Sequence, residues 1–198
     1  MANRKEVHFK ETTSEIGNLA VKWSYLEFVI ERLIWVLAGF ATYEECDIFL
    51  HNLDVRQKAQ IAKSLAVLRP IDEKWKGKTI TALDTASNEF RNARNETIHS
   101  RWFLSDKGTR RQRIKIRISK PQSYAPREIT TLEEARPNLG AMKRISKSIE
   151  KLSRELELLH SYAGVWKGNQ EGSQAISYAQ FVRLVRSESR RRQKPKKA

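Results

Sequence analysis

Apolar residues recur at helical spacing along most of this chain, and this period restricts the fold more than any other feature. A helix that buries one face repeats its apolar residues every three or four positions, whereas a half-buried strand alternates them. We therefore predict a mainly α protein, an up-down helical bundle in which two long helices pack together. The two apolar stripes comprise Ile16, Leu19, Ala20, Trp23, Leu26, Ile30, Leu33, Ile34 and Leu37, and then Met142, Ile145, Ile149, Leu152, Leu156, Leu159 and Tyr162.

Capping residues mark where several helices begin and end. Residues 71–78 form a connector or a short turn of helix, and a further helix then runs from about Thr79 to His99. Expected helix starts are Thr12–Glu15, Thr42–Glu45 and Asp54 with Gln57, and expected ends are Gly39 and Arg69–Pro70.

Residues 102–118 change from helical to strand character. Trp102–Leu104, the turn Ser105–Gly108 and the alternating run Arg113–Ile118 predict a small basic β-hairpin, inserted after the helix that ends near His99. The outward side of its second strand is either a solvated face or a contact for an RNA backbone, and the two interpretations carry equal weight. The basic residues on that side are Arg113, Lys115 and Arg117.

We expect one helical domain over residues 1–163 and an appendage over residues 164–198. Thr131–Glu134 is expected to cap a helix, residues 164–173 to form a linker, and residues 175–185 to form a short helix. A disordered basic tail follows, which serves either solubility or, the interpretation we favour, attraction to RNA through counterion release. The tail residues assigned to RNA binding are Arg190, Arg191 and Arg192.

The chain carries a formal net charge of +15, which suits a polyanionic partner such as RNA. Its one cysteine, Cys46, excludes a disulfide framework within one chain, and the histidines lack metal-ligand spacing, so we expect no metal and no cofactor. The first ten residues are too polar for a secretory signal, and the most apolar run, residues 28–40, contains Glu31 and Arg32. A cytoplasmic protein without a membrane segment is expected.

Arg94, Asn95 and His99 form the pattern R-N-x-x-x-H at the end of the expected helix. RNA carries its own nucleophile, the 2′-hydroxyl, so cleavage requires only proton transfer and a cation for the crowded phosphate. Histidine titrates near neutral pH, arginine matches phosphate oxygens with a planar fork, and asparagine can orient either group. The three residues are therefore candidate catalytic residues.

Helix geometry places Arg91, Asn95 and His99 on one face, whereas Arg94 lies five residues before His99 and falls outside it. Three arrangements would bring Arg94 to His99: the arginine wraps around the helix, the helix loosens, or a second copy of the chain supplies the arginine. Glu27 interrupts the apolar stripe of the first helix. It either reaches solvent or pairs with Arg94 from behind, in which case Glu27 and Arg91 support the catalytic group.

The segment Arg94–His99 resembles the R-polar-x-x-x-H signature of HEPN domains, and the order of helices across residues 12–162 looks similar. This resemblance implies a helical homodimer whose two motifs face each other and cut single-stranded RNA without metal. Arg94 would stabilise the phosphate, Asn95 would orient the pair, and His99 would transfer the proton. The resemblance also implies a toxin or antiviral-defence role with an antitoxin or another partner protein. One branch of the family carries a modifiable tyrosine two residues after the histidine, where this chain has Arg101, so regulation of that type is not expected. Arg101 is instead a further candidate for RNA binding.

The leading hypothesis is a metal-independent endoribonuclease. The alternatives are a non-catalytic RNA- or nucleotide-binding module, and a helical interaction protein in which Arg94 and His99 serve only the structure. Cleavage that survives EDTA but requires His99 distinguishes the first hypothesis from the other two.

Overall fold

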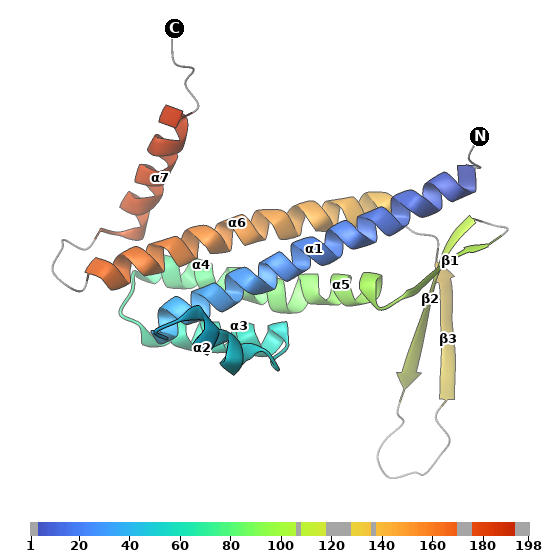
Figure 1. Ribbon diagram of the computed structural model, residues 1–198, viewed down its shortest axis with the longest axis horizontal. Coiled ribbons are helices and arrows are strands. Elements are labelled where there is room, and N and C mark those ends of the chain that lie inside the picture. The colour runs from blue at the N-terminus through green and yellow to red at the C-terminus, as the bar shows by residue number, and fades with distance from the viewer. Residues whose placement is uncertain (1–3, 106–107, 118–127, 136–137, 170–175, 193–198) are drawn as a thin grey trace, which may run out of the picture. The chain divides into compact units, whose positions relative to one another are not determined.

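The computed structural model describes residues 4–105, 108–117, 128–135, 138–169 and 176–192. The chain is mainly helical, and a small antiparallel sheet follows the helix that carries Arg94 (Figure 1). The prediction of a mainly α fold with a β-hairpin after that helix is confirmed. The elements are α1 Arg4–Ala38, α2 Tyr43–Leu50, α3 Val55–Leu68, α4 Glu73–Asp84, the π-helix η1 Thr85–Phe90, α5 Arg91–Ile98, β1 Arg101–Ser105, β2 Gly108–Arg117, β3 Glu128–Ala135, α6 Leu139–Asn169 and α7 Tyr178–Arg192.

The chain divides into two compact units. The first contains Met1–Tyr25 and Glu89–Glu150, and the second contains Leu26–Asn88 and Lys151–Ala198. Helices α1 and α6 contribute residues to both units because they are 35 and 31 residues long. Every residue of the R-N-x-x-x-H motif lies in the first unit. In the described residues, no helix has both the length and the apolar character needed to cross a bilayer.

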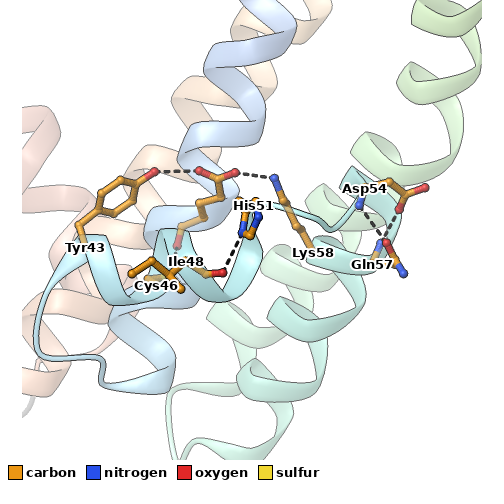
Figure 2. A network of polar contacts seen from close by, with 8 residues as sticks. Tyr43, Cys46, Ile48, His51, Asp54, Gln57 and Lys58 are labelled. Carbon is orange, nitrogen blue, oxygen red and sulfur yellow. Dashed lines mark hydrogen bonds and ion pairs between the residues drawn. The ribbon is translucent and has the colours of Figure 1, made fainter.

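A buried polar network joins α1, α2 and α3 in the second unit (Figure 2). The Glu31 carboxylate accepts from Lys58 Nζ at 2.6 Å and from the Tyr43 hydroxyl at 2.8 Å. Burial has the largest effect on the pKa of Tyr43 and raises it, and the hydrogen bond to Glu31 raises it further. Burial also raises the pKa of Cys46 to about 11, and the charge of Glu31 adds to the effect. Since a charge out of water is costly unless paired, the network fixes how these three helices meet.

The first helix begins at Arg4, so the expected start at Thr12 is wrong. The Thr12 hydroxyl donates to the His8 carbonyl at 2.8 Å, which is a helix-interior bond and not a cap. His8 Nδ1 lies 3.1 Å from the Thr109 hydroxyl on β2. This tertiary contact holds the additional turns against the sheet. The expected end is confirmed, because Gly39 follows the helix with φ of +81°.

Two further helix starts are confirmed and one is corrected. The Thr42 side chain accepts from the Glu45 amide, and Asp54 with Gln57 forms a complete capping box. Of the two alternatives for residues 71–78, the connector is wrong, and so is the helix start expected near Thr79, because α4 begins at Glu73 behind the cap formed by Asp72. Trp75 is fully buried and donates from its indole nitrogen to the Leu159 carbonyl at 2.9 Å. This tertiary packing continues the helix through Gly77.

The helix that carries the motif changes its winding before the motif begins. Thr85–Phe90 is a π-helix, and regular α-helix resumes at Arg91. Nearby hydroxyls bond to carbonyls of the preceding turn, as Thr85 does to Thr81 and Ser87 to Asp84. Such bonds compete with the regular helical pattern. Because a π-turn holds more residues than an α-turn, helical spacing does not relate the two sides of this segment.

The sheet contains the expected hairpin and one strand that was not expected. β1 pairs with β2 across the turn Ser105–Gly108, where Gly108 has φ of +95°. β3 pairs antiparallel with β2. The helix cap expected at Thr131–Glu134 is therefore wrong, since those residues lie in β3, where Thr131 pairs with Ile114 and Leu132 with Arg113. An open strand edge can satisfy the backbone of such a segment, whatever its local capping pattern.

The C-terminal part is more helical than expected. α6 continues to Asn169, so residues 164–169 are not a linker. α7 spans Tyr178–Arg192 instead of residues 175–185, and Arg190, Arg191 and Arg192 lie on its last turn instead of in a disordered tail. Tyr178 and Phe181 pack on Tyr162 with ring centroids 5.2 and 5.4 Å apart. This aromatic packing anchors α7, and propensity alone does not reveal it.

Candidate functional site

Helix α5 and the residue after it carry the motif. The helix is eight residues long and ends at Ile98, and His99 caps it with φ of −88° and ψ of 8°. The His99 amide donates to the Asn95 carbonyl at 3.3 Å. His99 is exposed, whereas Arg94 and Asn95 are half-buried. The imidazole therefore lies where the helix opens to solvent.

Arg94 reaches His99 within one chain. Its Nη1 lies 2.7 Å from His99 Nε2 and donates to Asn95 Oδ1 at 2.9 Å. The contact forms within one chain, so a second copy is not needed to supply the arginine, and His99 lies just beyond the regular helix, which ends at Ile98. Guanidinium nitrogens only donate, so Nε2 is the acceptor in this contact. The arrangement joins a proton acceptor to a permanent cation.

Trp23 of α1 lies behind the arginine. The Arg94 Cζ atom is 5.8 Å from the centroid of the Trp23 ring, a cation–π distance. Trp23 is 2% exposed and is therefore a rigid platform. From the sequence, Trp23 is expected only in the apolar stripe of the first helix. The two residues are 71 positions apart, so no spacing signal links them.

Arg94 also carries an unsatisfied donor. Its Nε is buried and has no hydrogen-bond partner among the residues that the structure describes. A buried donor without a partner costs about 1–3 kcal/mol.

The end of α5 is fixed by hydrogen bonds to its last carbonyls. The Trp102 indole donates to the Thr97 carbonyl at 2.8 Å, and the Ser100 hydroxyl donates to the Glu96 carbonyl. Thr97 donates in turn to the Ala93 carbonyl at 2.9 Å. The bonds to Glu96 and Thr97 satisfy carbonyls that a helix end leaves open, and they fix the backbone on both sides of His99.

A pocket of about 210 Å³ lies on another face of α5 and contains none of the three motif residues. Its volume is below that of typical small-molecule sites, and it does not extend the motif. The lining residues are Ala93, Glu96, Thr97, Trp102, Arg111, Asn138, Ala141, Met142 and Ile145.

For the supporting and RNA-binding residues expected from the sequence, the structure gives a position in the fold. Glu27 is half-buried and belongs to the second unit, so its pairing with Arg94 stays a prediction. Arg91 is half-buried at the first position of α5, and Arg101 is exposed at the first position of β1. For the remaining candidates the structure describes the backbone and not the side chains: Arg113, Lys115 and Arg117 on β2, and Arg190, Arg191 and Arg192 on α7.

No three His, Cys, Asp or Glu side chains gather as a metal site within the described residues. The first unit is thus a helical scaffold with an Arg–Asn–His group at an exposed helix end. Comparisons of the chain with protein-family models, curated proteins and solved structures found no match. The functional assignment therefore rests on the geometry of the Arg94, Asn95 and His99 side chains.

Proposed function

We propose that this protein is a metal-independent endoribonuclease that cuts single-stranded RNA. The observation that supports the proposal most directly is the 2.7 Å contact between Arg94 Nη1 and His99 Nε2 at an exposed helix end. The contact unites a group that moves protons with a group that holds a phosphate. The resemblance to HEPN domains, carried by Arg94, Asn95 and His99, points to the same chemistry.

In the proposed reaction, a backbone phosphate binds the guanidinium of Arg94 and draws it away from His99. The Nε2 lone pair then accepts the proton of the ribose 2′-hydroxyl, whose oxygen attacks the adjacent phosphorus. The bond to the 5′-oxygen breaks, and that oxygen takes up a proton as it leaves. The products carry a 2′,3′-cyclic phosphate and a 5′-hydroxyl, and Arg94 offsets the charge of the crowded phosphate.

Two copies of the chain would supply two motifs, so we include a homodimer in the proposal. The family resemblance further suggests a toxin or defence role in the cytoplasm, with an antitoxin or other partner that controls the activity. The net charge of +15 favours an RNA substrate by attraction.

The direct test incubates the purified protein with labelled single-stranded RNA in EDTA. Cleavage is expected to persist, and His99→Ala should lower its rate by about 10²–10⁴-fold, the range for loss of a general acid–base group. Arg94→Ala should lower it by a similar factor. Mass spectrometry of the fragments should find cyclic phosphate ends.

Matched controls exist in the second unit. His51 is exposed, and its Nδ1 lies 2.9 Å from the Ile48 carbonyl, so His51→Ala should leave cleavage unchanged. Arg56 is exposed on α3 and provides the control for Arg94→Ala. The proposal would be contradicted if EDTA abolished cleavage, or if His99→Ala cleaved RNA as well as His51→Ala does. RNA binding without cleavage would favour the alternative of a non-catalytic binding module.

A further inference from the structure

A second basic feature lies in the other unit, in a groove formed by α4, α6 and α7. Its volume is about 460 Å³, within the range of about 300–1,000 Å³ that is usual for small-ligand sites. The lining residues are Lys74, Lys78, Glu155, Leu158, Tyr178, Ala179, Val182, Arg183 and Arg186.

The walls of the groove are fixed by packing. The Tyr162 hydroxyl donates to the Ile176 carbonyl at 2.9 Å, directly before α7 begins. The Tyr162 ring packs on Tyr178 and Phe181 of α7, and on Trp75 of α4 with centroids 6.5 Å apart. One tyrosine of α6 thus links the two basic helices, so the groove does not depend on a loop.

The groove is strongly positive. Lys74 and Lys78 are four residues apart on α4, and Arg183 and Arg186 are three apart on α7, so each pair shares one helix face. All four side chains are exposed, and within the described residues none forms an ion pair with a carboxylate. Glu155 is the single acidic residue in the lining. Four cations against one carboxylate attract an anion.

The floor of the groove differs from its rim. Leu158, Ala179 and Val182 give it an apolar surface, beside the ring of Tyr178. Burial raises the pKa of Tyr178, the charge of Glu155 adds to the rise, and Arg186 partly opposes it. The hydroxyl therefore stays protonated and can donate a hydrogen bond. A nucleotide combines the two matching parts, a charged phosphate and a flat, largely apolar base.

We propose that this groove binds nucleotide phosphates, with the phosphates on the lysine and arginine rim and a base or ribose on the apolar floor. The same chemistry is offered by a single-stranded RNA and by a free nucleoside triphosphate. The RNA form rests on the proposed ribonuclease function, because the groove then holds part of the substrate away from the cleaved bond. The triphosphate form does not depend on that function.

The test removes two rim charges, in Lys78→Gln with Arg183→Gln. The matched control, Arg56→Gln with Lys151→Gln, removes two exposed charges outside the groove. Fluorescence anisotropy measures binding of a labelled oligouridylate on the His99→Ala background, and calorimetry measures binding of ATP. Circular dichroism checks the fold; if the double variant unfolds, Lys74→Gln and Arg186→Gln are measured singly.

The groove variant should bind at least one probe roughly tenfold more weakly than the control, and for RNA the slope of log K against log salt should fall by about 1.4, two contacts at about 0.7 each. If only the affinity for RNA falls, the ligand of the groove is an RNA strand. If the affinity for ATP falls, the ligand is a free nucleotide. Equal affinities of groove and control variants for both probes would overturn the proposal. If the wild type cleaves RNA and the groove variant binds both probes as well as the control does, only the groove proposal is refuted. If the groove variant binds more weakly but the wild type does not cleave RNA, only the nuclease proposal is refuted.

Discussion

The guanidinium of Arg94 lies over the indole of Trp23, with Cζ 5.8 Å from the ring centroid. The tryptophan is buried, and the arginine extends from it to the exposed imidazole of His99. A core residue of α1 is thus connected through one side chain to the candidate catalytic histidine.

The first prediction concerns Trp23→Leu. A cation–π contact is worth about 0.5–2 kcal/mol, so its loss should lower RNA cleavage by roughly two- to thirtyfold. Trp23→Phe keeps an aromatic face and should retain more of the activity. Cleavage rates at saturating RNA provide the measurement, with thermal unfolding recorded in parallel to correct for lost packing. If the leucine and phenylalanine variants cleave equally well, the ring does not position Arg94.

The second prediction concerns Arg94→Lys. One ammonium keeps the charge and could replace Nη1, the single nitrogen that contacts both Asn95 and His99, but it lacks the planar fork that fits phosphate oxygens. Cleavage should fall by at least about tenfold. The buried Nε donor disappears as well, so the unfolding free energy should stay equal or rise by up to about 1 kcal/mol. Urea denaturation measures this. A clear loss of stability would instead support a structural role for Arg94.

The third prediction concerns the pair of Lys58 and Glu31, whose side chains are 9% and 13% exposed. Lys58→Met leaves a largely buried carboxylate without its cation and should lower the unfolding free energy by about 3–5 kcal/mol. Lys76→Met is the control, because its partner Glu73 is 86% exposed and such pairs contribute about 0–1 kcal/mol. Urea denaturation of both variants measures the difference. Equal losses would show that the network in Figure 2 does not hold the second unit together.

The fourth prediction concerns His160, whose pKa is lowered by burial and, to a smaller extent, by Arg32, with Glu157 opposing. Below about pH 6.5 the unfolded chain takes up a proton that the folded chain does not, so the unfolding free energy falls as pH falls. The fall ends once pH drops below the folded pKa. His160→Gln should lose less stability than the wild type between pH 7.5 and pH 5 in urea denaturation. Parallel losses in the two proteins would contradict this assignment.

Local chemistry predicted much of the fold. The apolar stripe of α6 and the capping box at Asp54 describe helices that exist, and the alternating residues before Ile118 lie on a strand. These signals act over a few residues, and their physics is the same in any fold. Thr12 and Thr131 carry local signals of the same kind but lie inside a helix and a strand. There, contacts from distant residues outweighed the cap.

The candidate site was predicted in its residues but not in its geometry. Arg94, Asn95 and His99 were selected by chemical type and order. Helical spacing separated Arg94 from His99, and the structure brings them within 2.7 Å because a long side chain crosses the helix end. The basic groove was not predicted, since Lys78 and Arg183 are distant in sequence and no periodicity relates them.

The sequence alone therefore determined the helical character, several helix ends and which side chains are candidates for acid–base and phosphate chemistry, because these depend on residues within one or two turns. Only the tertiary structure decided that Trp23 supports Arg94, that a π-helix precedes the motif, and that α4 and α7 share a groove. These relationships depend on close packing between distant segments, and the free energy of such packing is not contained in any local pattern.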